Sequence, residues 1–290
     1  MKPRSFEYRR VANLEEAYEL LSKYADDAKI IAGGQSLVPM MNLRLASPSV
    51  LVDIGGIDEL KRTSCDGEVL RIGSLTRHRQ VETDELIARN APLLVLAVQH
   101  VAHLAVRNRG TFGGSICHAD PAAEFPACSL LLQAEMELGS VRGIRSVPAN
   151  EFFHGPFMTS VEADEVLLAV KIRSAASDEH FAFHELSRRQ GDFAMSGVAA
   201  RAKFAPQRIE TRWVGFGVSG HPILLPAVTE LFTERAFDAV SESEVRAAVD
   251  DDLPAEDDDV EKVMLQRTLT SELVQRCASD LIGSRERRSG

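Results

Sequence analysis

The sequence predicts an α+β protein with two domains, and three observations support this fold class. Helical and strand-like segments alternate without the strict βαβ rhythm of a doubly wound sheet. The length of 290 residues exceeds the usual size of a single core. A small polar linker, residues 173–178, follows a run of strand and helix signals. We expect a first domain over residues 1–175, with subdomains of about 1–55 and 56–175, and a smaller α+β domain over residues 176–290.

The first predicted element is a helix over residues 14–24. Asn13 and Glu16 supply an N-cap and an N3 partner at its start, and the apolar residues that follow share one helical face. A short buried strand over residues 29–32 comes next and leads into a Gly-Gly loop. The order strand, loop, helix is therefore expected at this point of the chain.

The remaining elements are predicted from apolar periodicity and turn residues. Asp66-Gly67 is a typical hairpin turn signal between two strand-like segments. The expected elements are a helix over 37–45 capped near Ser36, a strand over 50–54, a hairpin over 65–72, helices over 93–105 and 122–132, strands over 180–186, 194–203 and 213–218, and a helix over 260–281.

Composition and charge exclude several classes of protein. The net charge of −10 and the pI near 5.4, with no basic stripe interleaved with aromatics, exclude nucleic acid and anionic membranes as partners. No apolar run is long enough for membrane insertion, so we expect a cytoplasmic protein. The acidic run over residues 250–259 predicts a solvated loop between helices.

The cysteines indicate reduced thiols. Cys65, Cys117, Cys128 and Cys277 are widely scattered and form no C-x-x-C pair. This spacing fits neither a disulfide framework nor a zinc site nor an iron–sulfur cluster. Cys117 lies just after a Gly-Gly loop, where covalent flavin attachment and a buried unreactive thiol are the two interpretations.

Two loops that combine paired glycines with a hydroxyl are the main candidates for ligand binding. Residues 32–36 read Ala-Gly-Gly-Gln-Ser, and residues 107–115 end in Thr-Phe-Gly-Gly-Ser. Glycine lets the backbone approach a ligand closely, and a hydroxyl adds a rotatable donor. The first loop precedes a predicted helix start, where backbone amides can meet a phosphate. Two such loops predict a bridging group held from both sides, as in a dinucleotide pyrophosphate. Neither loop matches a Rossmann or P-loop motif.

A third candidate element is the acidic stretch that follows the second loop. Asp120 precedes Pro121, and Glu124 lies near the expected helix start. A carboxylate here can accept hydrogen bonds from sugar hydroxyls. Alternatively, Asp120 is an N-cap with Pro121 at the first helical position. Both interpretations are compatible if Asp120 caps the helix and Glu124 binds the ligand.

Taken together, these motifs resemble the FAD-binding medium subunit of the molybdenum hydroxylases, as in carbon monoxide dehydrogenase, nicotine dehydrogenase and the flavin domain of xanthine dehydrogenase. The resemblance covers about residues 1–220 in order and is thin beyond them. The matching segments are residues 32–39 for the first pyrophosphate motif, 107–115 with 118–127 for the second, 155–157 with 164–168 for a stretch beside the flavin, and 188–194 near the isoalloxazine.

The sequence departs from the family pattern at three positions. Phe112 replaces the aliphatic residue that is usual between Thr111 and the Gly-Gly pair, and Glu124 stands where Asp is common. Phe193 occupies a place that Tyr or Trp often holds. None of these changes removes a phosphate-binding amide.

The resemblance implies an oxidoreductase subunit that binds FAD and carries no catalytic side chain or metal of its own. It implies a two-subdomain FAD-binding domain of the PCMH or vanillyl-alcohol-oxidase type. Molybdopterin would sit in a large partner subunit and two [2Fe–2S] clusters in a small one, in a dimer of heterotrimers, or heterohexamer. Electrons would pass from the clusters through FAD to an external acceptor. The implied cofactor-binding residues are Lys29, Ile30, Ile31, Ala32, Gly33, Gly34, Gln35, Ser36, Leu37, Thr111, Phe112, Gly113, Gly114, Ser115, Asp120, Glu124, Arg189, Asp192 and Phe193.

Other interpretations stay open at this point. Phe193 either packs on the flavin ring or is an ordinary core residue. The histidine pairs 100/103 and 180/184 have suitable spacing for a metal but no third ligand. The chain as a whole is alternatively a self-contained FAD-dependent oxidase, or a nucleotide-binding interaction module without enzymatic activity.

Overall fold

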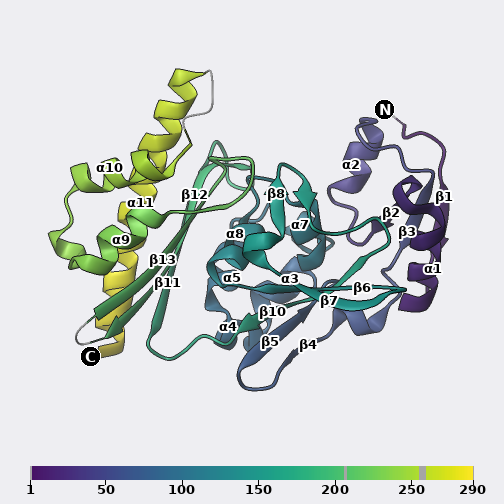
Figure 1. Cartoon of the computed structure of the whole chain (residues 1–290), viewed down its shortest axis with the longest axis horizontal. Helices are drawn as coiled ribbons and strands as arrows, with labels where there is room; N and C mark the ends of the chain where they lie inside the picture. Colours follow the sequence, from purple (N-terminus) through teal and green to yellow (C-terminus); the bar gives the residue numbers. More distant parts are fainter. Residues whose placement is uncertain (1, 206–207, 255–258, 290) are drawn as a thin grey trace.

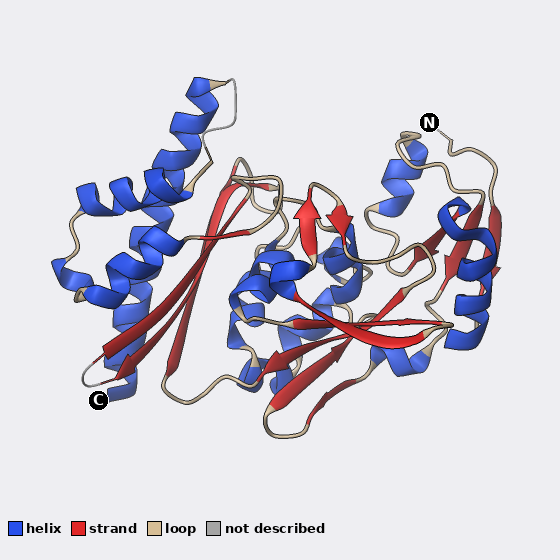
Figure 2. Cartoon of the chain, viewed as in Figure 1, coloured by secondary structure: helices blue, strands red, loops and turns tan. Residues whose placement is uncertain are grey.

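The computed structural model describes residues 2–205, 208–254 and 259–289 of the chain. The molecule is elongated, with the N-terminal elements at one end and the C-terminal helices at the other (Figure 1). Along its length, sheets alternate with groups of helices (Figure 2). This mixture of helices with largely antiparallel sheets confirms the predicted α+β class.

The N-terminal unit is a small parallel sheet with one helix packed on it. Its elements are β1 Glu7–Arg10, α1 Leu14–Tyr24, η1 Ala25–Asp27, β2 Ala28–Ile31, α2 Leu37–Asn42 and β3 Val50–Asp53, with strand order β1-β3-β2. Helix α1 packs on β2 and β3, where Leu21 and Val52 are buried. The predicted helix over residues 14–24 is confirmed, and the Asn13 side chain accepts the Glu16 N–H at 2.9 Å.

The central unit contains an antiparallel sheet and a group of short helices. Its elements are η2 Asp58–Lys61, β4 Thr63–Cys65, β5 Val69–Gly73, α3 His78–Thr83, α4 Glu85–Asn90, α5 Pro92–Val98, α6 Leu104–Arg107, α7 Phe112–His118, α8 Glu124–Leu131, β6 Glu135–Ser140, β7 Gly143–Pro148, η3 Ala149–Glu151, β8 Phe153–Gly155, β9 Met158–Thr159 and β10 Val166–Arg173. The strand order is β4-β5-β10-β6-β7, and the predicted hairpin is the β4–β5 pair. Strand β10 pairs with β5 and β6 in the middle of the sheet, and no local sequence pattern predicted this pairing.

The C-terminal unit is a sheet with helices on both faces. Its elements are β11 Glu179–Ser187, β12 Ala194–Ala205, β13 Arg208–Phe216, β14 Ile223–Leu224, α9 Pro226–Glu234, η4 Phe237–Ala239, α10 Glu242–Asp252 and α11 Val260–Ser289. Alternate residues of the sheet face opposite sides. Phe183 and Phe216 pack into the core that α5 and α8 share, whereas Ala182 and Trp213 pack under α9, α10 and α11. One apolar core therefore runs from the central helices onto this sheet.

Four predicted helices differ from the observed ones, and one of them, α11, continues to Ser289, beyond its predicted end at residue 281. The predicted helix over 93–105 is two helices, α5 and α6, because Ala102 adopts a left-handed conformation with φ of 41° between them. Helix α2 stops at Asn42, and Arg44 is left-handed shortly after it. Helix α8 starts at Glu124, two residues later than predicted. Propensity alone did not locate these ends.

The acidic run is more structured than predicted. Residues 250–252 form the last turn of α10, whereas residues 255–258 lie outside the described residues. The Asp252 carboxylate accepts the backbone N–H groups of Ala227 and Val228 at 2.8 and 3.0 Å. It therefore satisfies first-turn donors of α9 from a distant part of the chain. Within the described residues, no helix is both long and apolar enough to cross a bilayer.

Candidate functional site

The two Gly-Gly loops, far apart in the sequence, touch each other in the structure. A Cβ atom placed on Gly33 would lie 2.4 Å from the Arg109 carbonyl oxygen and 2.9 Å from the Gly110 Cα. Any side chain at residue 33 would therefore push the two loops apart. The prediction that both loops face one ligand is compatible with this contact, which forms the centre of the candidate site.

The first loop presents a row of free backbone donors. The N–H groups of residues 33–36 have no hydrogen-bond acceptor among the described residues. Gly34 is left-handed with φ of 71°, and the Gln35 side chain donates to the Gly33 carbonyl oxygen at 3.0 Å. Successive unpaired amides of this kind form an anion-binding concavity. Of the predicted residues on this side, Lys29 and Ser36 are exposed, and the others are half-buried: Ile30, Ile31, Ala32, Gly33, Gly34, Gln35 and Leu37.

The second loop is built differently, because its amides donate within the chain. The N–H groups of Phe112 and Gly113 donate to the carbonyl oxygens of Thr76 and Ser74, at 2.8 and 2.9 Å. Thr111 is the N-cap of α7 and accepts the Gly114 N–H at 3.1 Å. A Cβ atom on Gly113 would lie 2.5 Å from the Ser74 Cβ, so this glycine permits close packing on the β5–α3 turn.

These contacts limit the number of groups in the second loop that can bind a ligand. Thr111, Phe112 and Gly113 are buried, and Gly114 and Ser115 are half-buried. The Phe112 ring packs edge-on against Phe125, with 4.9 Å between ring centroids. The Ser115 hydroxyl has no hydrogen-bond partner among the described residues. Loop 107–115 thus offers a hydroxyl and a close backbone approach more than free amides.

Sequence analysis missed the turn behind the second loop, residues 74–78. His78 is buried, and its Nε2 hydrogen-bonds the Thr111 carbonyl oxygen at 2.9 Å. Burial lowers the pKa of His78 to about 4, so the ring is neutral at physiological pH. The Arg77 guanidinium donates to the Arg109 carbonyl oxygen. This turn has no glycine pair, and the available signal was the polar residues Ser74, Thr76, Arg77 and His78 directly after a strand.

The acidic residues after the second loop have different roles in the structure. The Asp120 carboxylate accepts the Ala122 N–H at 2.9 Å and closes a turn. Helix α8 has Ala123 as its N-cap, so the interpretation of Asp120 as the helix cap is wrong. Glu124 begins α8 and is half-buried. Burial, and then the nearby Glu185 carboxyl, raises the pKa of Glu124 to about 8.

Glu185, which sequence analysis did not single out, faces Glu124 from strand β11. Its side chain is only 3% exposed, and its Oε2 atom has no hydrogen-bond partner among the described residues. The His100 Nδ1 atom lies 3.7 Å from its Oε1 atom. Burial raises the pKa of Glu185 to about 7. Burial therefore disfavours the ionisation of two neighbouring carboxyl groups, one on α8 and one on β11.

The segment over residues 188–193 forms an exposed turn between β11 and β12. The Asp192 N–H donates to the Arg189 carbonyl oxygen at 3.0 Å, and both side chains are exposed. The Phe193 side chain is 73% exposed, so the interpretation of Phe193 as a core residue is wrong. An aromatic ring held in water is available to pack on a ligand or a partner.

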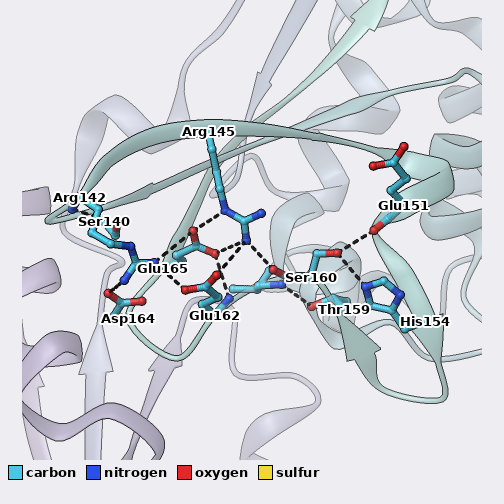
Figure 3. A network of polar contacts seen from close by, with 11 residues as sticks. Ser140, Arg142, Arg145, Glu151, His154, Thr159, Ser160, Glu162, Asp164 and Glu165 are labelled. Carbon is cyan, nitrogen blue, oxygen red and sulfur yellow. Dashed lines mark hydrogen bonds and ion pairs between the residues drawn. The ribbon is translucent and has the colours of Figure 1, made fainter.

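A polar network holds residues 160–165, at the start of the stretch over 164–168 that the resemblance places beside the flavin (Figure 3). Arg145 on β7 donates two hydrogen bonds, of 2.7 and 2.8 Å, to the buried Glu165 carboxylate. Arg142 pairs with Glu162 at 2.7 Å and with Asp164. The stretch continues into β10, whose Leu168 carbonyl oxygen accepts the Ser74 N–H at 3.0 Å. The network therefore supports the turn on which the second loop rests.

Ionisation of the Cys117 thiol is suppressed by burial, and His180 and His184 have partners in α11. Burial raises the pKa of Cys117 to about 12, which suppresses its thiolate. His180 hydrogen-bonds Ser284 at 2.8 Å, and His184 pairs with Asp280 at 2.9 Å. In the part of the chain that the structure describes, no group of three or more His, Cys, Asp or Glu side chains is arranged to hold a metal ion.

Comparison with known protein families gives two matches that together span most of the chain. Residues 4–173 match the FAD binding domain in molybdopterin dehydrogenase. Residues 181–281 match the CO dehydrogenase flavoprotein C-terminal domain. The second match covers the region where sequence analysis found only a thin resemblance.

Curated relatives and solved structures point in the same direction. The caffeine dehydrogenase subunit beta of Pseudomonas sp. (strain CBB1) is 40% identical over 69% of this chain and 68% of its own length. The nicotine 6-hydroxylase medium subunit of Paenarthrobacter nicotinovorans is 40% identical over 75% of this chain and 76% of its own. A chain of carbon monoxide dehydrogenase from Hydrogenophaga pseudoflava superimposes with a TM-score of 0.90 at 32% identity, covering 98% of this chain and 99% of that chain. Quinoline 2-oxidoreductase from Pseudomonas putida 86 also gives 0.90, at 35% identity and with the same coverage.

Proposed function

Because the chain belongs to the family of FAD-binding medium subunits of molybdenum hydroxylases, we propose that it passes electrons from the [2Fe–2S] clusters of a partner subunit through FAD to an external acceptor. Molybdopterin and the clusters sit in partner subunits in this family. The chain is thus an oxidoreductase subunit, and substrate oxidation takes place in another chain.

One observation carries the proposal for where FAD binds: the first loop, with its free backbone donors, touches the second loop, which leads into α7 and its Ser115 hydroxyl, unpartnered among the described residues. The unpaired N–H groups of residues 33–36 suit phosphate oxygens, and the Ser115 hydroxyl adds a further donor. Gly33 permits the close approach of the loops. The residues present therefore fit the diphosphate of a dinucleotide.

The other predicted residues are assigned by their surroundings. Glu124 is half-buried, lies after the second loop and is protonated for much of the physiological range, so it suits a hydrogen bond to a hydroxyl of the ribityl chain or sugar. The exposed Phe193 suits packing on the isoalloxazine, with Arg189 and Asp192 beside it. Asp120 supports the turn that precedes Glu124.

In this mechanism the chain binds and orients its cofactor and performs no acid–base step of its own. FAD supplies the redox chemistry when bound, since it exchanges electrons with one-electron and two-electron partners. The backbone of residues 33–36 anchors the diphosphate, and the supported turn over 74–78 keeps the second loop in place. The network around Glu165 holds the neighbouring stretch rigid.

Assembly, location and domain limits are part of the proposal. We place the chain in a dimer of heterotrimers with a large molybdopterin-binding subunit and a small [2Fe–2S] subunit. The relatives' names, medium subunit and medium chain, support a larger and a smaller partner. The scattered free cysteines support a reducing, cytoplasmic location. The family matches, which end at residue 173 and resume at 181, support domains of 1–175 and 176–290.

The test is to purify the native complex and measure flavin, iron and molybdenum per medium chain. We expect FAD in stoichiometric amount with the medium chain, and iron and molybdenum in proportion to the partner chains. A complex that contains iron and molybdenum but no flavin contradicts the proposal. Substrate oxidation by this chain alone points to a self-contained oxidase, and ADP that competes as strongly as FAD points to a nucleotide-binding module.

A further inference from the structure

Arg77 lies where the two Gly-Gly loops meet. Its Nη1 atom donates to the Arg109 carbonyl oxygen, which is the atom that a Cβ on Gly33 would approach to 2.4 Å. Arg77 and the backbone of the first loop therefore converge on one oxygen of the second loop. The guanidinium has five N–H donors in a fixed fork, and this single hydrogen bond leaves most of them available.

The backbone of Arg77 is held firmly in this position. Its N–H donates to the Gln80 side chain at 2.8 Å, and it forms an isolated β-bridge with Thr111. The next residue, His78, donates its N–H to the Gly110 carbonyl oxygen at 3.1 Å. The guanidinium thus projects from a rigid turn, so little entropy is lost when it binds a ligand.

The charges around Arg77 favour an anion. Burial and the nearby Arg109 both lower the pKa of Arg77, whereas Asp53 raises it. Asp53 already accepts hydrogen bonds from the Tyr8 hydroxyl and from the Gly55 N–H, the latter at 2.8 Å. Arg77 and Arg109 form no ion pair with a carboxylate of the described residues. Two neighbouring guanidinium groups are best accommodated when an anion lies against them.

The backbone amides of the two loops carry no charge, and the second loop contributes only the side chain of Arg109 beside Arg77. The free amides of residues 33–36 are neutral donors, and the amides of Phe112, Gly113 and Gly114 donate within the chain. A diphosphate carries negative charge that needs neutralisation when it is partly removed from water. Arginine binds phosphate oxygens with two parallel, charge-assisted hydrogen bonds.

We propose that Arg77 is a diphosphate-binding residue, which contacts the phosphates of FAD at the junction of the two loops, with Arg109 as the second positive charge. This inference rests on the proposed function, because it concerns the same cofactor. It goes further in assigning a diphosphate contact to Arg77, a residue of a turn outside both glycine motifs. It also predicts that the effect follows the diphosphate and not the flavin ring.

The test uses the native complex after removal of flavin and measures the affinity for FAD and for ADP at low and high salt. We expect Arg77→Gln to weaken both ligands by about tenfold or more. The salt dependence of binding decreases in this variant, because one exposed charge contact is lost. Arg77→Lys recovers part of the affinity, since it restores a charge without the fork. Arg89→Gln, an equal charge change at an exposed position of α4, leaves both affinities unchanged.

Several outcomes overturn the inference without touching the proposed function. The first is that Arg77→Gln binds FAD as tightly as the wild type does. The second is that Arg77→Gln loses affinity for FAD but keeps its affinity for ADP. A loss of affinity for both ligands with unchanged salt dependence means that Arg77 only holds the second loop in place. Arg109→Gln keeps the carbonyl oxygen that Arg77 contacts, so it tests the charge independently if Arg77→Gln does not fold; full affinity there also contradicts the inference. A wild-type complex that binds no FAD contradicts the proposed function instead.

Discussion

At the scale of single residues, the site depends on glycines, whose lack of a side chain permits close backbone contacts. Gly33 has no side chain, and this absence lets the first loop reach the backbone of Arg109 and Gly110. Gly113 plays the same part against Ser74. The two glycine loops thus make contact with each other and with a supporting turn, and their free groups converge on one region.

We expect Gly33→Ala to lower the FAD affinity of the complex by about tenfold or more, a loss of roughly 1.4 kcal/mol. The added Cβ would lie 2.4 Å from a backbone oxygen that cannot rotate away, so the loops must separate. Titration of the flavin-free complex with FAD measures this effect. Gly283→Ala in α11 is the matched control, because its Cβ has only an ordinary contact of 3.4 Å with the Arg287 side chain. Equal FAD affinity of wild type and Gly33→Ala would falsify the two-loop model.

At the scale of elements, the second loop is supported by layers of contacts behind it. Arg145 on β7 donates two hydrogen bonds to the Glu165 carboxylate, directly before β10. Strand β10 accepts a hydrogen bond from Ser74, and Ser74 accepts one from Gly113. The Arg145–Glu165 pair, drawn in Figure 3, is therefore linked to the second loop through β10 and Ser74.

We expect Glu165→Gln to destabilise the protein by about 1–3 kcal/mol, because it removes a charge-assisted acceptor from a nearly buried position. The Glu165 side chain is only 2% exposed, and hydrogen bonds from Arg145 hold its pKa below the usual value although burial opposes this. Urea unfolding followed by circular dichroism measures the change. Glu162→Gln is the control, since that side chain is 61% exposed and its loss costs within about 0.5 kcal/mol. Equal stability of both variants would mean that the network does not support the fold.

At the scale of the whole molecule, the C-terminal sheet and the central helices share one core with a polar centre. Phe183 packs near His100, with ring centroids 5.3 Å apart, and Phe216 stacks on Phe183. The Glu185 carboxyl lies beside His100 at this contact, and burial raises the pKa of both Glu185 and the nearby Glu124. Holding two ionised carboxylates there is unfavourable, so the contact is strongest when they are protonated.

Stability is therefore expected to fall as pH rises from about 6.5 to 8. In this window both glutamates are ionised in the unfolded chain but still bind protons in the folded chain, where their pKa values are about 8 and about 7. The unfolded state thus binds fewer protons, and the free energy of unfolding decreases with pH. The buried His78 and the half-buried His100 have pKa values lowered by burial. Below about pH 6.5 their titration changes the stability in the opposite direction.

Glu185→Gln isolates this effect. It removes one of the two groups and also the carboxyl that helps to raise the pKa of Glu124, so the slope between pH 6.5 and 8 becomes shallower. Urea unfolding at several pH values gives the slope directly. Glu230→Gln at an exposed position of α9 is the control and leaves the slope unchanged. A wild-type stability that rises over this window contradicts the assignment.

Local sequence pattern was sufficient for much of this protein. The capped helix over residues 14–24, the strand before the first loop, the hairpin at Asp66-Gly67 and the two Gly-Gly loops all depend on neighbours in the chain, and the structure contains each of them. The family resemblance rested on the same short motifs and is confirmed. Element ends were less predictable, because left-handed residues such as Ala102 interrupt helices that propensity would continue.

Tertiary structure alone brought together the groups that give the site its charge. Arg77 reaches the second loop only because the turn after β5 packs against that loop, and Glu185 comes near Glu124 only because β11 packs beside the central helices. Tertiary contacts also give N–H groups of the second loop acceptors within the chain, whereas the N–H groups of residues 33–36 have no acceptor among the described residues. The physical reason is that pairing and burial depend on contacts between distant segments, whereas periodicity and turn preference report only on neighbours.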